Sequence, residues 1–283
     1  MLEEVIEMLN PKIGGIYVDA TIGVGGHSER ILDLIGPEGK LIGIDKDSES
    51  LGIAEKRLSG KGVVLKKGNF SEMESIILQE GIQQVHGMLF DLGISMYQLK
   101  NLKRGFSFFS HGRLDMRMDK GQNLSAWDVV NLYPEKLLEK ILREYGEERR
   151  SRKIAKLIVK VRQIAPINTC AELTKLIERI YIRRGRTHPA TKIFQAFRIE
   201  VNNELEQLRA GLDASLRLLR KGGRLCVISY HSLEDRIVKQ FIIKNAKHSL
   251  LKIITKKPRT PSAEEMKNNP SSRSAKLRVA ERI

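Results

Sequence analysis

The chain has 283 residues, of which 41% are hydrophobic, which is enough for one full α/β domain plus a smaller second domain or a large insertion. This composition excludes a disordered or fibrous protein. The formal net charge of +16 is unevenly spread, because residues 1–100 carry 10 basic and 15 acidic side chains and residues 101–283 carry 40 and 19. Ordinary solvated Lys and Arg side chains predict a more even spread. The basic excess favours a polyanionic partner, either nucleic acid or an anionic membrane.

The two cysteines, Cys170 and Cys226, lie 56 positions apart with no second thiol or His at ligand spacing. This spacing predicts neither a zinc site nor a disulfide, and we expect both to be core residues. No apolar run approaches the roughly 18 residues of a membrane span. Residues 1–10 are acidic and amphipathic, unlike a signal peptide. We therefore expect a cytoplasmic protein with no membrane partner and no metal.

The first hundred residues alternate short β-rich runs with helical stretches, a pattern typical of a parallel sheet built from βαβ units. Strands are predicted at 16–20, 41–45, 63–66 and 85–91, and helices at 28–35, 48–58 and 72–80. Ser71 and Glu74 have the spacing of a capping box, so they are expected to open the third of these helices.

After residue 91 the strand pattern stops for about 130 residues, and residues 125–219 are predicted to form a succession of helices. Strand character returns at 224–230. We therefore predict a doubly wound, mostly parallel sheet formed by residues 1–104 and 216–283, with an inserted helical domain at 105–215. The polar, proline-containing segment 256–274 is expected to be a mobile loop before a last strand at 277–281.

The first expected strand runs directly into a glycine-rich turn, D-A-T-I-G-V-G-G-H at 19–27. Glycines let the backbone turn tightly and let a ligand approach, and the following helix offers free N–H groups. Ser28 stands where the nicotinamide-binding pattern G-x-G-x-x-G needs its third glycine, so that pattern fails. The D-x-T-x-G-x-G-G arrangement instead resembles the methionine-binding loop of class I methyltransferases. A merely tight turn between strand and helix is the alternative.

Two further strand ends carry candidate cofactor contacts. Asp45 closes the second strand, 22 positions after Gly23, where a carboxylate can accept hydrogen bonds from both hydroxyls of a ribose. Asp45 could instead cap the next helix, a role for which Asp47 is better placed. Phe70 follows the third strand, where such folds hold an adenine, and offers a flat apolar surface. A buried core phenylalanine is the alternative there.

The segment F-D-L-G-I-S-M-Y-Q-L at 90–99 leaves the fourth strand at the edge where open α/β sheets bind ligands. It resembles the signature D-L-G-x-S-x-x-Q-L of the bacterial 16S rRNA (cytosine-N4)-methyltransferase family. The resemblance extends through R-G-F-S-F at 104–108, L-D-M-R-M-D at 114–119, H-P-A-T-K-I-F-Q-A-F-R-I-E-V-N-N-E-L at 188–205, V-I-S-Y-H-S-L-E-D-R-I-V-K at 227–239 and S-S-R-S-A-K-L-R-V-A-E at 271–281. Met96 and Tyr97 depart from the Ser-Pro that is usual in this family.

The resemblance implies a class I methyltransferase (Rossmann-like) fold. It also implies transfer of a methyl group from S-adenosyl-L-methionine to the N4 amine of a cytidine in 16S ribosomal RNA, within the small ribosomal subunit. The cofactor contacts carried over are Gly25, Gly26, His27, Asp45, Phe70, Asp91 and Gln98. Asp115 and His231 are candidate catalytic acceptors for the amine protons, with Ser229 beside His231. A salt bridge of Asp115 with Arg113 or Arg117, and a helix cap at His231, are the alternatives.

Three rival classes share some of these features. A nicotinamide dehydrogenase would need the third glycine. An RNA-binding module with a degenerate cofactor site would explain the charge but would not need Gly25, Gly26, Asp45 and Asp91 together. DNA amino-methyltransferases typically carry D/S-P-P-Y/W after the fourth strand, where this chain has D-L-G-I at 91–94. In the helical insertion, Arg183, Arg184 and Arg186 are predicted to contact RNA phosphates. A solvated face, or packing against Glu178, is the alternative.

Overall fold

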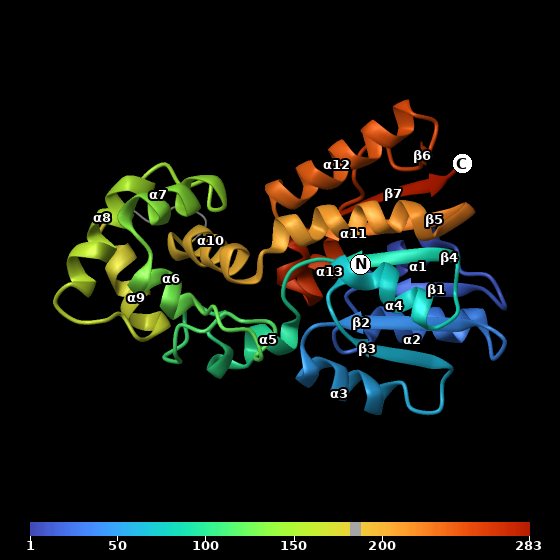
Figure 1. Ribbon diagram of the computed structural model, residues 1–283, viewed down its shortest axis with the longest axis horizontal. Coiled ribbons are helices and arrows are strands. Elements are labelled where there is room, and N and C mark those ends of the chain that lie inside the picture. Colours follow the sequence, from blue (N-terminus) through green and yellow to red (C-terminus); the bar gives the residue numbers. More distant parts are fainter. Residues whose placement is uncertain (182–187) are drawn as a thin grey trace. The chain divides into compact units, whose positions relative to one another are not determined.

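A computed structural model describes residues 1–181 and 188–283 and divides the chain into two compact units (Figure 1). The sheet unit comprises Met1–Gly93 and Leu205–Ile283, and the helical unit comprises Ile94–Glu204. The expected α/β fold with a helical insertion is confirmed. The three arginines predicted to contact RNA, Arg183, Arg184 and Arg186, lie outside the described residues.

The sheet unit contains a seven-stranded sheet in the order β3-β2-β1-β4-β5-β7-β6. The strands are β1 (Ile16–Asp19), β2 (Lys40–Asp45), β3 (Val63–Lys67), β4 (Val85–Asp91), β5 (Leu219–Ser229), β6 (Leu251–Ile253) and β7 (Lys276–Arg282). Strands β1 to β5 are parallel to one another, and β7 pairs antiparallel with both β5 and β6. Because β1, β4 and β5 are adjacent and parallel, their carboxyl ends lie at one edge of the sheet.

Helices cover both faces of this sheet. The helices are α1 (Leu2–Leu9), α2 (Gly26–Ile35), α3 (Ser48–Arg57), α4 (Met73–Gln79), α11 (Glu204–Leu218) and α12 (Ser232–Lys247). Apolar residues of α1, α2 and α3 pack in one core cluster with Tyr17, Leu41 and Cys226, and those of α4, α11 and α12 pack in another with Ile42 and Phe90. Strand residues alternate between the two clusters, as the period of a β-strand requires.

Two expectations about local structure are wrong. The third helix is not opened by Ser71: a 3₁₀ turn, η1 (Phe70–Glu72), precedes α4, and Asn69 forms the capping box with Glu72. Asn caps as well as Ser, so the box starts two residues earlier. Segment 256–274 is not a bare loop, since it contains α13 (Ala263–Asn268) and η3 (Pro270–Ser274). Ser262 starts α13 by accepting the Glu265 N–H at 3.1 Å.

The helical unit has its own core. Its helices are α5 (Met96–Lys100), η2 (Leu102–Arg104), α6 (Ala126–Leu132), α7 (Glu135–Glu144), α8 (Ser151–Arg162), α9 (Cys170–Glu178) and α10 (Ala190–Asn202). The irregular segment between η2 and α6 is fixed by two buried polar side chains. Arg104 donates to the Arg117 and Met118 carbonyls. Asn202 accepts the Met118 N–H at 2.8 Å and donates to the Met116 carbonyl, also at 2.8 Å.

The unit boundaries differ by 11 residues from the expected 104/105 and 215/216. Phe106 and the residues after it pack in the helical core, but the unit already begins at Ile94, which packs against that core. On the other side, Leu208 and Leu212 of α11 are buried in the core of the sheet unit. A succession of helical patterns does not mark where one core ends, so the sequence places residues 204–215, most of α11, in the insertion.

Cys170 and Cys226 are both buried free thiols, as expected. In the part of the chain that the structure describes, no helix is both long and apolar enough to cross a membrane.

Candidate active site

The glycine turn after β1 has the geometry of a ligand cradle. Gly23 and Gly25 adopt positive φ angles of 51° and 82°, which favour glycine. A Cβ atom on Gly25 would lie 3.1 Å from the Leu58 side chain. Gly25 is the N-cap of α2, and among the residues that the structure describes no side chain caps that helix end. The first N–H groups of α2 are therefore suited to an anionic group.

Asp19 joins this turn to the sheet. Its buried carboxylate accepts the Ser28 hydroxyl at 2.7 Å and the Thr21 N–H at 3.2 Å. Burial raises the pKa of Asp19 to about 6, although both hydrogen bonds lower it. The sequence pattern of the glycine turn includes Asp19 but does not mark it as a site residue. Its role here is to hold β1 and α2 on either side of the cradle.

Asp45 shapes the same turn from the end of β2. One carboxylate oxygen accepts the Gly23 N–H and the other accepts the Asp47 N–H, both at 2.9 Å. Burial raises the pKa of Asp45, against the opposing effect of the two N–H donors. Asp47, and not Asp45, caps α3 by accepting the Glu49 N–H. The helix-cap alternative for Asp45 is therefore wrong.

A second carboxylate, Asp91, stands at the end of β4 between two side chains. The Tyr230 hydroxyl donates to Asp91 Oδ1 at 2.9 Å, and His27 Nδ1 lies 3.5 Å from Asp91 Oδ2. Burial and the nearby Asp91 carboxylate raise the pKa of Tyr230, so the phenol stays protonated and remains a donor. The other ring nitrogen, His27 Nε2, is buried and has no hydrogen-bond partner within the described ranges. A buried, unsatisfied nitrogen beside the glycine cradle is a feature that a bound ligand would satisfy.

Tyr230 was missed as an individual site residue. Its position in the sequence could have indicated it, because a polar residue directly after the fifth strand lies next to the end of the fourth strand when these two strands are parallel neighbours. The register confirms this neighbourhood, with Asp91 opposite Ile228.

Phe70 lies in the 3₁₀ turn after β3 and is only partly buried. Its ring packs edge-on against Phe90 with ring centroids 5.6 Å apart. It packs against the core without being a fully buried core residue. A flat apolar surface therefore stands at the end of the third strand.

Gln98 belongs to the helical unit, where its side chain is buried. Ser95 and Gln98 form the capping box of α5: Gln98 Oε1 accepts the Ser95 N–H at 3.0 Å, and Ser95 Oγ accepts the Gln98 N–H. Helix α5 therefore forms without the family's usual Ser-Pro at Met96 and Tyr97.

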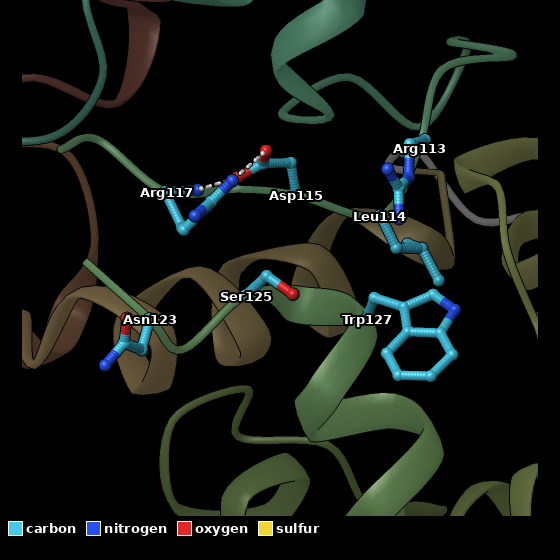
Figure 2. Close-up of a pocket in the computed structure, with 7 residues that line it drawn as sticks. All are labelled: Arg113, Leu114, Asp115, Arg117, Asn123, Ser125 and Trp127. Atoms are coloured by element: carbon cyan, nitrogen blue, oxygen red, sulfur yellow. Dashed lines mark hydrogen bonds and ion pairs between the residues drawn. The ribbon is translucent and has the colours of Figure 1, made fainter. Parts of the chain in front are cut away.

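Asp115 lines a pocket of the helical unit (Figure 2). The residues around this pocket are Arg113, Leu114, Asp115, Arg117, Asn123, Ser125 and Trp127. The Arg117 guanidinium donates to both carboxylate oxygens of Asp115, at 2.8 and 3.0 Å, as the dashed lines of Figure 2 show. Burial alone would raise the pKa of Asp115, but the hydrogen bonds from Arg117 hold it below the usual value. The salt-bridge alternative is present, with Arg117 and not Arg113 as the partner.

His231 is the N-cap of α12. Its Nδ1 accepts the Glu234 N–H at 3.4 Å, and its Nε2 lies 3.1 Å from Glu234 Oε1. Glu234 in turn accepts the Tyr230 N–H at 2.9 Å. The helix-cap alternative for His231 is therefore present in the structure.

The structure thus brings five of the predicted cofactor residues, Gly25, Gly26, His27, Asp45 and Asp91, around one turn of the sheet unit. A family model described as the MraW methylase family matches residues 1–283. The chain belongs to the MraW methylase family.

Members of this family are methyltransferases that use S-adenosyl-L-methionine. One curated relative, a ribosomal RNA small subunit methyltransferase H from Caldicellulosiruptor bescii, is 48% identical over 300 residues, covering 100% of this chain and 98% of the relative. Another of the same name, from Persephonella marina, is 50% identical over 285 residues, covering 99% of this chain and 97% of the relative. The glycine cradle and the unsatisfied His27 nitrogen fit such a cofactor.

Proposed function

We propose that this protein transfers a methyl group from S-adenosyl-L-methionine to the N4 amine of a cytidine in 16S ribosomal RNA. The observation that carries the proposal is the glycine turn held between the Asp45 and Asp91 carboxylates at the carboxyl ends of β2 and β4. In open α/β sheets this edge is where ligands bind. Full-length similarity to ribosomal RNA small subunit methyltransferases supports the choice of substrate.

The cofactor contacts proposed for this chain follow from the chemistry of each group. Gly25, Gly26 and His27 suit the methionine part, because backbone N–H groups and an imidazole nitrogen can bind a carboxylate. Asp45 suits the ribose hydroxyls, and Phe70 suits the adenine. Asp91 and Gln98 complete the contacts carried over from the family. When bound, the cofactor supplies a methyl group on a sulfonium, which is electrophilic without further activation.

The N4 amine of cytidine is a weak nucleophile because its lone pair is conjugated with the ring. Acceptors aimed at its N–H groups would keep that lone pair directed at the methyl group and later remove the proton. Asp115 and His231 remain the proposed acceptors. Both oxygens of Asp115 already accept hydrogen bonds from Arg117, which hold its pKa below the usual value and make it a weaker base. His231 keeps a buried ring nitrogen, Nε2, that faces Glu234.

In this proposal most of the cofactor contacts come from the sheet unit, and the helical unit recognises the RNA. The RNA is bound within the small ribosomal subunit, in the cytoplasm. The target base must be unstacked or already single-stranded, because the reacting amine has to reach the methyl group.

The proposal is tested by incubating the purified protein with tritiated S-adenosyl-L-methionine and either 16S ribosomal RNA or small ribosomal subunits. We expect label in N4-methylcytidine after digestion to nucleosides. Total RNA from another source and double-stranded DNA serve as controls. Label in DNA, or no label in either ribosomal substrate, would contradict the proposal.

A further inference from the structure

Helix α8 of the helical unit carries a strongly one-sided charge. Arg152, Lys153, Lys156 and Lys160 are all exposed, and the helix contains no acidic residue. At 3.6 residues per turn these four side chains fall within about 100° of the helix circumference. The opposite side is buried in the core of the unit through Ile154, Ala155 and Ile158. We refer to the four cations as the basic face of α8.

None of these four cations forms a hydrogen bond or an ion pair with another of the described residues. Nearby cations do find partners. Arg162, at the end of α8, donates to the Val130 and Tyr133 carbonyls, and Arg143 of α7 lies 3.9 Å from Glu139 and 3.7 Å from Glu144.

The basic face does not help the helix to fold. Arg152, Lys156 and Lys160 follow one another at spacings of four residues, and like charges at that spacing destabilise a helix. The helical unit as a whole does not balance the charge either, since residues 94–204 carry 23 basic and 12 acidic side chains. A partner that supplies negative charge would explain the arrangement.

The chemistry of α8 favours RNA over a membrane as that partner. A helix that lies in a membrane interface needs an apolar face free to enter the lipid. The apolar side of α8 is instead packed in the protein core, with Ile158 and Ala155 fully buried. Only charged groups are presented outward, as a polyphosphate backbone requires.

We propose that the basic face of α8 binds the phosphate backbone of the ribosomal RNA substrate. With a rise of 1.5 Å per residue, Arg152, Lys156 and Lys160 stand about 6 Å apart along the axis. This spacing lets the three side chains contact successive phosphates of one strand. The inference rests on the proposed function and adds where the RNA backbone is held. Such contacts position the RNA and do not read its sequence.

The test compares two triple variants of the full chain. Arg152→Gln, Lys156→Gln and Lys160→Gln remove three charges from the basic face, and Gln has nearly the same helix propensity as Lys and Arg. Lys136→Gln, Lys140→Gln and Arg143→Gln remove three charges from α7 as the matched control. Binding to transcribed 16S ribosomal RNA is measured across a salt series. Each phosphate contact contributes about 0.7 to the slope of log affinity against log salt for single strands, so the α8 variant should lose about 2 from this slope.

We expect the α7 control to change the slope by less than about 1 and both variants to keep the wild-type affinity for S-adenosyl-L-methionine. The proposal would be overturned if the slope of log affinity against log salt were the same for the wild type and the α8 variant. It would also be overturned if the α8 and α7 variants lost the same amount of slope. Loss of binding to phosphatidylserine vesicles with RNA binding unchanged would overturn it as well.

Wild-type methyl transfer to the same RNA separates this proposal from the proposed function. If the wild type transfers the methyl group but the α8 variant keeps the wild-type salt slope, only the proposed role of the basic face is refuted. If the α8 variant has a reduced salt slope but the wild type transfers no methyl group, the role of the basic face is supported and the proposed methylation is refuted.

Discussion

Asp45→Ala should weaken both the fold and the binding of S-adenosyl-L-methionine. The carboxylate accepts the Gly23 and Asp47 N–H groups, each at 2.9 Å, so its removal leaves two backbone donors without a protein acceptor. Because the side chain is not fully buried, water replaces part of the loss. At about 1 kcal/mol per bond, the free energy of unfolding should fall by about 2 kcal/mol.

The expected loss of affinity comes from the ribose. A hydrogen bond from a hydroxyl to a carboxylate contributes about 1.5 to 3 kcal/mol, and about 1.4 kcal/mol corresponds to a tenfold change in affinity. Even one lost ribose bond therefore predicts a dissociation constant at least about tenfold higher. Isothermal titration calorimetry measures it, and urea unfolding measures the stability of the same preparation.

Asp47→Ala is the matched control. Asp47 caps α3 through the Glu49 N–H, so its loss should cost about 1 kcal/mol of stability. Since Asp47 is not proposed to contact the ribose, the affinity for S-adenosyl-L-methionine should stay near the wild-type value. If both variants lose affinity by the same factor, Asp45 acts only through the fold and its assignment to the ribose is refuted.

Three further variants test individual groups. Burial raises the pKa of Asp19 to about 6, so its contribution to the free energy of unfolding is present below about pH 4 and is lost as the pH rises through 6, by about 3 kcal/mol in total. Asp19→Asn should abolish this loss when urea unfolding is measured from pH 4 to 8. If the free energy of unfolding depends on pH in the same way in the variant and the wild type, the prediction is contradicted. Tyr230→Phe removes the donor to Asp91 and should lower the affinity for S-adenosyl-L-methionine about tenfold by calorimetry, whereas an unchanged affinity would exclude a positioning role. Asn202→Ala leaves the Met118 N–H buried without its acceptor and should lower the free energy of unfolding by about 2 to 4 kcal/mol; a loss under about 1 kcal/mol would show that the bond is replaced.

The parallel part of the sheet could be predicted because its signals are local. Three of these strands end in Asp and one is followed by Gly, and the predicted ranges lie within a residue or two of β1, β2, β3 and β4. The helical insertion followed from the long interruption before β5. These features depend on hydrophobic periodicity and on turn residues, which can be recognised without knowledge of the rest of the fold.

The edge of the sheet could not be predicted in the same way. Strand β6 has three residues, Leu251–Ile253, of which only Leu251 is buried, and it exists because it pairs with β7. Helix α13 is short and polar, and its start at Ser262 was hidden by the neighbouring prolines. Such elements are stabilised by tertiary pairing and capping, which a single sequence shows weakly.

The candidate site also contains residues that local sequence signals predict and contacts that depend on the rest of the fold. The Asp45 and glycine-turn residues were predicted because strand ends and glycines mark a ligand edge. The pairing of Asp91 with Tyr230 joins residues 139 positions apart and depends on the register of β4 with β5. The bidentate Arg117 contact that lowers the basicity of Asp115 was only one of two salt bridges that the sequence allowed.

If this protein methylates a cytidine of 16S ribosomal RNA at N4, the modified base should depend on the gene. Nucleoside mass spectrometry of 16S ribosomal RNA from cells with and without the gene measures this dependence. We expect N4-methylated cytidine to fall when the gene is deleted and to return when the wild-type gene is restored, but not when an Asp45→Ala, Asp91→Ala double variant is supplied. An unchanged amount of N4-methylated cytidine in the deletion strain would contradict the claim.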